Sequence, residues 1–368
     1  MKKELHTLLP AGFATLALLA VQAPAQTQYA VSILPVPAPY LGGNVSSINN
    51  GVAAGSAYTN CQGKLGCVSL LVPMAWPTLG AALDLTRNTN VQLSSAIQAV
   101  QPNMFGGYDT EGGTTHAILI NPLLAGHIDL NSIFFASKVL AMCPGYQAGY
   151  AQTTPVTSSG GGSSGVTWHA MLWFGDPNSW VDLHNQMDVS QVTACDGNVQ
   201  VGWAGSRSFT QHAVMWTGSR TSEIDLHSGA SQSDQALGVS GNTQVGWGAF
   251  LDHDTRQEFA HALLWHGAPN TLTDIHPAAY QNSQAFAAAG NKQVGFAVNG
   301  NDPVAPGTYH GLLWFGTAAS VIDLNQFLPA GYTDAQVDAI DSVTGIIAGA
   351  AKGPKGVFEP AVWIPVAQ

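Results

Sequence analysis

One motif returns along this sequence with its internal spacing intact, and that repetition limits the folds open to the chain. Its clearest copy runs from His169-Ala-Met-Leu-Trp173 to Asp182-Leu183. In five copies a histidine precedes an aspartate by thirteen residues, a spacing that unconstrained loops would not keep. The pairs are His116 and Asp129, His169 and Asp182, His212 and Asp225, His261 and Asp274, and His310 and Asp323. Tandem copies at a fixed period predict a repeat architecture.

Each copy is expected to form a β-hairpin. The run before the tryptophan is short and apolar, which is typical of a buried strand, and the run ending in Asp-Leu would be its partner. If histidine and aspartate lie opposite each other, the midpoint falls at Gly175, Gly218, Gly267 or Gly316. Glycine readily adopts the positive φ that a type I′ or II′ turn requires, so a two-residue turn is predicted. A four-residue loop around a type I turn also fits.

The repeated histidines are expected to have a structural role. An imidazole that faces a carboxylate on the neighbouring strand can form a charge-assisted hydrogen bond of about 1.5–3 kcal/mol. The alternative is a ring of metal-binding or proton-relay histidines. A catalytic site needs different residues that converge once, which identical copies do not supply. No catalytic, cofactor-binding or metal-binding residue is therefore assigned, and no cofactor is expected.

Two more short segments precede each hairpin, as in Gln191-Val-Thr-Ala194 and Asn198-Val-Gln-Val201-Gly202, which gives four strands per unit. Counting units by the tryptophan position gives seven, at an average interval of about 48 residues. This interval is typical of four-stranded propeller blades. The positions are Trp76, Ile120, Trp173, Trp216, Trp265, Trp314 and Trp363.

The two ends of the sequence complement each other. After Trp363 only five residues remain, so the seventh unit lacks its Asp-Leu strand, whereas Tyr29-Ala-Val-Ser-Ile33 resembles a spare copy of it. A strand donated to the last blade would close the ring and remove an exposed edge. We therefore predict an all-β, seven-bladed β-propeller of four-stranded blades, closed by an N-terminal strand. An open β-solenoid is the alternative, but it has no need for complementary ends.

The repeated units, His-Ala-x-x-Trp with a following Asp-Leu, resemble the HAF family of extracellular repeats, which is named for its His-Ala-Phe tripeptide. The resemblance spans residues 29–368. No unit here has phenylalanine after His-Ala, since Ile118, Met171, Val214 and Leu263 stand there, and the outermost copies lack the histidine. The resemblance implies export from bacteria and a propeller-like array, and it implies no established activity.

Residues 1–25 have the features of a secretory signal peptide: a positive start at Met1-Lys2-Lys3, an apolar run, and Ala23-Pro24-Ala25 as a cleavage site. The apolar run is shorter than the ~20 residues that a spanning helix requires. Residues 26–368 are expected to form one propeller domain that is secreted, periplasmic or on the cell surface. Removing two lysines and one glutamate with the leader changes the formal charge from −11 to −12.

Composition narrows the range of partners. Charged residues are only 9% of the chain, against roughly 25% in ordinary soluble domains. An acidic, lysine-poor surface repels phosphates, so nucleic acid is not expected to bind. No basic amphipathic segment suggests a membrane surface. The expected partner is an extracellular ligand or protein, and the expected state is a monomer.

Four cysteines in an exported chain suggest disulfides. Cys61 and Cys67 are expected to close a small loop in the first blade. Cys143 and Cys195 are expected to be buried free thiols. Aligning the repeats places Met142, not Cys143, at the level of Cys195, so the two thiols should point to opposite faces of neighbouring strands.

Other clusters of polar residues are weak candidates for a site. Asp252-His253-Asp254 is the densest set of possible metal ligands, but successive side chains alternate in direction along an extended chain, so a solvated loop is expected. His184, His227 and His276 follow outer strands of different blades and should lie far apart. The sequence contains no nucleophile elbow, phosphate loop or His-Glu-x-x-His motif.

A binding surface is expected at the loops 247–260 and 297–309 and at the mouth of the central channel. The Ser- and Gly-rich insert 153–165 is interpreted as a linker within the third blade. The leading hypothesis is a binding or interaction propeller. One alternative is a polysaccharide-active extracellular enzyme, which requires two carboxylates within about 5–10 Å of each other in a pocket. A structural cell-surface component is the other.

Overall fold

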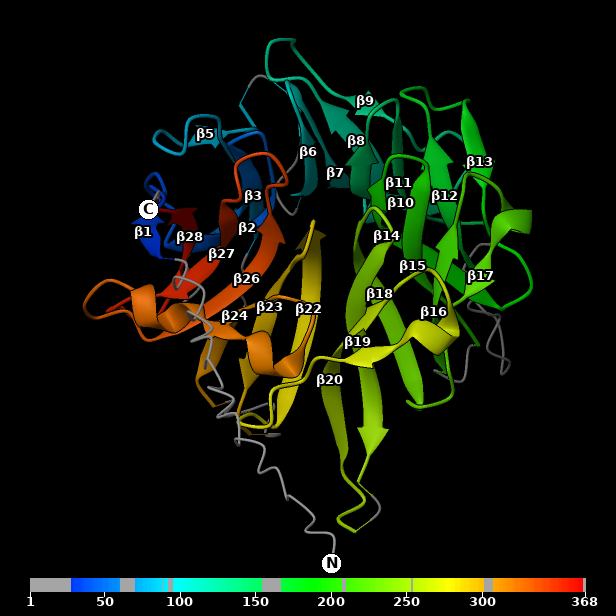
Figure 1. Ribbon diagram of the computed structural model, residues 1–368. Helices are drawn as coiled ribbons and strands as arrows, with labels where there is room; N and C mark the ends of the chain where they lie inside the picture. The colour runs from blue at the N-terminus through cyan, green and yellow to red at the C-terminus, as the bar shows by residue number, and fades with distance from the viewer. Residues whose placement is uncertain are drawn as a thin grey trace, which may run out of the picture.

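The computed structural model describes residues 28–59, 70–87, 89–91, 95–153, 167–206, 210–252, 254–300 and 307–366. The strands in these residues form seven antiparallel sheets of four strands, arranged as blades around a central axis (Figure 1). The predicted signal peptide, the predicted Cys61–Cys67 pair and most of the insert 153–165 lie outside the described residues. No helix in the described ranges is both long and apolar enough to cross a membrane.

The blades follow the chain in order. Blades 1 to 3 consist of β2 (Gly42–Asn49), β3 (Val52–Tyr58), β4 (Leu71–Trp76) and β5 (Leu83–Asp84); β6 (Ala96–Gln101), β7 (Met104–Glu111), β8 (Thr114–Ile120) and β9 (Ile128–Asp129); and β10 (Ala136–Cys143), β11 (Tyr146–Gln152), β12 (Trp168–Trp173) and β13 (Trp180–Asp182). Blades 4 and 5 consist of β14 (Val189–Asp196), β15 (Val199–Gly205), β16 (Gln211–Trp216) and β17 (Ile224–Asp225); and β18 (Ser233–Ser240), β19 (Thr243–Leu251), β20 (Glu258–Trp265) and β21 (Thr273–Asp274). Blades 6 and 7 consist of β22 (Asn282–Ala289), β23 (Lys292–Val298), β24 (Tyr309–Trp314) and β25 (Ile322–Asp323); and β26 (Asp334–Ile340), β27 (Ile347–Lys352), β28 (Phe358–Pro365) and β1 (Tyr29–Ile33).

The predicted seven-bladed propeller and its closure are confirmed. The last blade has the strand order β26-β27-β28-β1 (Figure 1). Within it, Val31 pairs directly with Trp363. The first and last strands of the described chain therefore share one sheet. This pairing closes the ring and contradicts the open solenoid.

The predicted two-residue hairpin turn is wrong. Asp182 lies opposite Met171, not His169, and the loop between β12 and β13 spans residues 174–179. Gly175 still has a positive φ of 77°. The first N–H of the loop, that of Phe174, donates to the Ser179 carbonyl at 3.0 Å, and the next, that of Gly175, donates to the Gln147 side chain at 2.9 Å. The same bond joins Gly218 to Gln200, Gly267 to Gln244, and Gly316 to Gln293.

The hydrophobic core lies between the blades. Six tryptophans at the repeated position are fully buried: Trp76, Trp173, Trp216, Trp265, Trp314 and Trp363. The cluster around Trp265, for example, joins Val201 and Met215 of blade 4 to Val239 and Leu263 of blade 5. Each sheet therefore buries its faces against its neighbours, so stacking in a closed ring is what completes the core.

Every inner strand carries a β-bulge at the same level. The pairing of β14 with β15, for example, shifts between Val192 and Ala194, which leaves Thr193 as the extra residue. A glycine on the second strand always faces the residue before the bulge. A Cβ built on Gly202 would lie 1.9 Å from the Gln191 carbonyl oxygen. A Cβ built on any of the six equivalent glycines would come similarly close to the carbonyl oxygen that it faces. The bulge thus requires the glycine of the Val-Gly motif.

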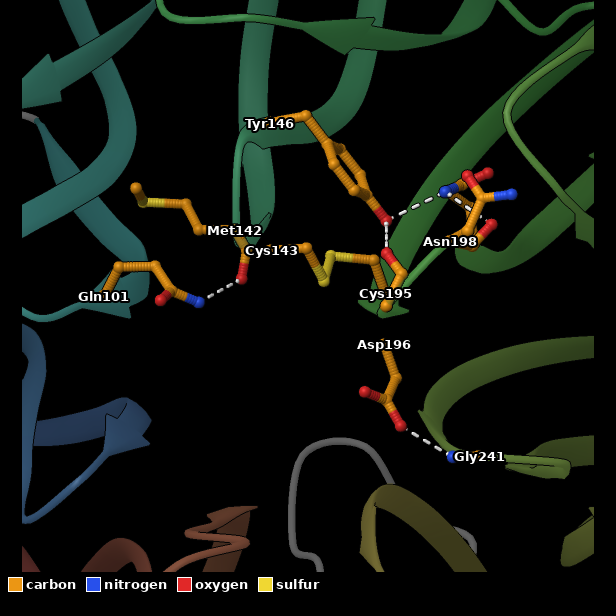
Figure 2. Close-up of a disulfide and its surroundings, with 10 residues drawn as sticks. Gln101, Met142, Cys143, Tyr146, Cys195, Asp196, Asn198 and Gly241 are labelled. Carbon is orange, nitrogen blue, oxygen red and sulfur yellow. Dashed lines mark hydrogen bonds between the residues drawn. A yellow bond between two sulfur atoms is a disulfide. The ribbon is translucent and has the colours of Figure 1, made fainter.

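Cys143 and Cys195 form a disulfide between blades 3 and 4 (Figure 2). The prediction of free thiols is wrong, although the repeat alignment behind it is right, because β10 and β14 share the same register. In the ring, one face of blade 3 packs against the opposite face of blade 4. Two side chains that point to opposite faces of their own strands can therefore meet between these blades. Met142 packs against Gly106 of blade 2, and Cys143, one position later, faces blade 4.

Further bonds link neighbouring blades on the same side of the ring. Gln101 donates to the Met142 carbonyl at 2.9 Å, and the Gly241 N–H donates to Asp196 at 2.6 Å (Figure 2). The Gly51 N–H of blade 1 donates to Asp341 of blade 7 at 2.7 Å. These contacts hold the turns between first and second strands against one another.

Candidate functional site

The central channel contains the cavities that all seven blades build together. An entrance cavity of about 430 Å³ lies where the inner strands begin, at the end of the blades that carries the connections between second and third strands. A second, inner cavity of about 210 Å³ follows the inner strands beyond it. Both are lined by the seven bulge residues, which we call the bulge ring: Ser46, Gln98, Leu140, Thr193, Leu237, Phe286 and Asp338. The bulge ring is thus the neck between the two cavities.

Two hydroxyl groups of the bulge ring are used to hold the blades together. The Ser46 hydroxyl donates to the Ile97 carbonyl of blade 2 at 2.6 Å. The Thr193 hydroxyl donates to the Ala236 carbonyl of blade 5 at 2.7 Å. These side chains therefore contribute to the ring's rigidity, and their donor protons are not available to a ligand.

Asp338 is the charged member of the bulge ring. Burial raises the pKa of its carboxyl group to about 6, against a smaller opposing effect of the hydrogen bond from Asn44. Asn44 belongs to β2 of the adjacent blade 1 and also lines the entrance cavity. At neutral pH the carboxylate is therefore mostly ionised but poorly solvated, which favours a cationic partner.

Aromatic side chains lead away from the bulge ring across blades 6 and 7. Phe286 stacks on Phe296, with ring centroids 5.5 Å apart. Phe296 meets Tyr309 edge to face at 5.4 Å, and Tyr309 meets Phe358 at 6.3 Å. Such pairs add about 0.5–1.5 kcal/mol each beyond the apolar area that they bury. The stacking on Phe296 thus fixes the position of the Phe286 ring.

Two other features lie away from the neck, toward the connections between second and third strands. Lys138 Nζ lies 4.0 Å from the centre of the Tyr108 ring, and Tyr150 stacks on the partly exposed Trp168 at 5.3 Å. A cavity of about 360 Å³ is lined by Gln211, Trp247, Glu258 and Phe259, among others. The predicted loop 247–260 is mostly strand, since β19 extends to Leu251 and β20 begins at Glu258.

All five predicted His–Asp hydrogen bonds are present, between Nδ1 and Oδ2 at 2.7–2.9 Å. They run diagonally, because Asp182 lies opposite Met171 and not opposite His169. In Asp182 burial acts to raise the pKa, but the bond from His169, the N–H of His184 and the nearby histidine charges hold it below its ordinary value. Asp274 follows the same pattern.

The sequence analysis identified His184, His227 and His276 but missed that each stacks on the repeated histidine of its own blade. His184 stacks on His169 at 3.9 Å between ring centroids, and the pairs His212–His227 and His261–His276 stack at 4.0 Å. Burial and the neighbouring histidine lower the pKa of His184 and His276. The sequence feature that could have predicted this stacking is a histidine two residues after the aspartate in these three copies.

These stacks belong to three different blades, so they do not converge on one site. Within the described ranges, no three His, Cys, Asp or Glu side chains are grouped to hold a metal ion. His253, the centre of the Asp252–Asp254 cluster, lies outside those ranges.

A closed ring of four-stranded blades around a lined channel defines a β-propeller. No protein-family model matches the sequence, and neither does any curated protein sequence. Among solved structures, the chain is similar to the β-propeller domain of the Trilobed protease from Pyrococcus furiosus. The TM-score is 0.54 at 8% identity, over 89% of this chain and 94% of that one. That domain has an open velcro topology, whereas β1 closes the ring here.

Larger hydrolases contain a similar fold. For puromycin hydrolase the TM-score is 0.53 at 9% identity, over 91% of this chain and 55% of that one. For the acylaminoacyl peptidase of Pyrococcus horikoshii it is 0.51 at 9% identity, over 89% and 52%. The chain thus spans about half the length of these two enzymes. At such low identity the similarity shows the propeller fold alone.

Proposed function

We propose that this protein is an exported binding propeller whose ligand enters the channel through the entrance cavity. The observation that carries the proposal is the cavity itself, because residues from all seven blades line it. Its volume of about 430 Å³ lies within the 300–1,000 Å³ typical of small-molecule sites. Its lining combines apolar side chains such as Leu71 and Phe286 with polar ones such as Asn44 and Gln98.

Enzymatic cleavage of polysaccharide is less well supported than binding. A pair of carboxylates would have to flank the scissile bond. Asp338 is the one carboxylate that lines the entrance and inner cavities in the part of the chain that the structure describes. We therefore propose no hydrolytic step.

The proposal of binding is tested with two tryptophan variants on blade 1. Leu71 lines the entrance cavity and is 37% exposed, and Leu83 is 38% exposed on the outermost strand β5. Purified protein is screened against arrays of glycans and of peptides. For any ligand found, Leu71→Trp should weaken binding about tenfold or more (~1.4 kcal/mol), and Leu83→Trp should leave it unchanged.

Two results would contradict the proposal. If both variants keep full affinity, the ligand does not use the channel. If no array member binds wild-type protein, the chain does not have the binding function proposed here.

Export rests on the leader-like residues 1–25 and on the resemblance to the HAF family. Fractionation of a bacterial culture tests it. The mature chain, beginning near residue 26, should appear in the periplasm or the medium. Recovery of the full-length chain only from the cytoplasm contradicts export.

A further inference from the structure

The bulge ring carries one unbalanced charge. Leu140, Leu237 and Phe286 are apolar, and the hydroxyls of Ser46 and Thr193 donate to backbone carbonyls. Among the described residues, Asp338 is the one charged side chain that lines either the entrance or the inner cavity. A half-buried carboxylate without a cation is costly, so a cation in the neck would be stabilised there.

The carboxylate has acceptor capacity beyond its bond with Asn44. Two carboxylate oxygens offer about four acceptor positions, and within the described chain Asp338 accepts a side-chain hydrogen bond from Asn44. An alkylammonium group supplies three N–H donors from a single compact charge. It therefore matches both the charge and the unused acceptors.

Phe286 provides a second attraction for the same group. It occupies the bulge position of β22 on blade 6, next to Asp338 on blade 7, and both line the two cavities. An aromatic face attracts cations by about 0.5–2 kcal/mol, depending on how far they are desolvated. Since Phe286 stacks on Phe296, its ring is supported in its position. An anionic ligand would gain nothing from this ring and would be repelled by Asp338.

The net charge of the whole molecule also favours a cationic ligand. The formal net charge is −11, which raises the local concentration of cations near the surface. A contact between an ammonium group and an aromatic ring is also present elsewhere in the chain: the Lys138 ammonium lies over the Tyr108 ring, 4.0 Å from its centre.

We propose that the bulge ring binds a primary ammonium group at the end of an unbranched alkyl chain, with Asp338 as its ion-pair partner and Phe286 as its aromatic contact. The alkyl chain lies in the entrance cavity. This inference rests on the proposed binding function, and it adds the chemical class of the ligand.

Isothermal titration at pH 8 with 1-butylammonium chloride tests the inference, with 1-butanol as the neutral analogue of equal length. Butylammonium should bind saturably at one site and butanol should not. Asp338→Asn should weaken binding at least about tenfold, and Phe286→Leu about two- to fivefold. Asp254→Asn is the matched control, since it removes the same charge from an exposed loop residue and should change nothing.

A pH series on the wild-type protein gives a readout that needs no substitution. The Asp338 carboxyl has its pKa near 6, so at pH 5 about a tenth of it is ionised. Butylammonium keeps its charge throughout this range. Binding should therefore be about tenfold weaker at pH 5 than at pH 8, and this dependence should disappear in Asp338→Asn.

A second arm identifies the source of the ammonium group. A Gly-Gly-Lys-Gly-Gly peptide is compared with the same peptide containing norleucine, both acetylated and amidated at their ends. Binding of the lysine peptide points to a polypeptide partner, and binding of butylammonium alone points to a free amine.

Equal affinity for butanol, or full affinity in Asp338→Asn, overturns the inference. If butylammonium and the lysine peptide both fail to bind while an array ligand is lost in Leu71→Trp, the ammonium site is wrong and the binding propeller stands. If the array yields no ligand either, both proposals fall.

Discussion

Replacing both Cys143 and Cys195 by alanine should destabilise the protein by about 4 kcal/mol. The disulfide joins residues that are 52 apart in the sequence and fixes blade 3 to blade 4. In the chain-entropy treatment, a crosslink that closes a loop of about 50 residues removes ~4 kcal/mol of conformational freedom from the unfolded chain. Typical measured values are about 2–4 kcal/mol, so the expected loss lies at the upper end.

The assay is equilibrium unfolding in urea, followed by tryptophan fluorescence. The buried tryptophans of adjacent blades report the loss of the core between them. The free energy of unfolding in water is extrapolated for the wild type and the double variant, each with and without reductant. The reductant should lower the stability of the wild type to that of the variant.

The double variant in reductant is the control, because Cys61 and Cys67 lie outside the described residues and could also respond. The alternative is a pair of buried free thiols. In that case the reductant changes the wild type no more than the variant, and alanine costs only the packing of two small side chains. A loss below about 1 kcal/mol, with no effect of reductant specific to the wild type, refutes the crosslink.

Three further predictions follow from the blades. Gly246→Ala should cost at least about 1–3 kcal/mol in urea unfolding, because its methyl would lie 1.8 Å from a carbonyl oxygen, whereas Gly80→Ala, whose methyl would make only an ordinary contact at 3.6 Å, should be neutral. Gln200→Leu should cost about 1–3 kcal/mol, because it leaves the N–H of the Gly218 loop without its acceptor; equal melting temperatures would contradict this. Burial and a stacked histidine lower the pKa of His184 and His276 below 6.5, so the stability that they contribute is complete above pH 6.5 and declines as the pH falls through that value. The Asp338 carboxyl, with its pKa raised to about 6, has the opposite effect over this range, so the measurement is made in Asp338→Asn. Calorimetry of that variant between pH 7.5 and 5 should show a falling melting temperature, and a flat profile contradicts the assignment.

The arrangement of the candidate site was only partly predictable. The sequence marks each blade's Val-Gly strand, and the channel mouth was expected to be the place for a ligand. The bulge ring was not predicted, although Gly202 stands nine residues after Thr193 and Gly246 nine after Leu237. That offset has structural meaning only once the bulge is known, because a bulge changes which side chain points into the channel.

The errors in the hairpin and the disulfide have different origins. The hairpin prediction treated a pair of strands as isolated, and the prediction of free thiols overlooked that adjacent blades meet with opposite faces. The Gln147 side chain on the adjacent strand accepts a hydrogen bond from the loop at Gly175, and the packing of blade 3 against blade 4 brings Cys143 to Cys195. Neither contact can be predicted from the spacing of residues within a single hairpin.

The sequence alone determined the number of blades, the four strands in each, and the closure through Tyr29–Ile33, because these depend on hydrophobic periodicity and on a count of copies. It also determined which histidine meets which aspartate, since both lie in one hairpin. Only the tertiary structure decided that seven residues from seven blades form one neck, with Asp338 as its charge and Phe286 beside it. The physical reason is that neighbours in this ring are about 50 residues apart in the chain, and their contact exists only after every blade has buried its faces against the next.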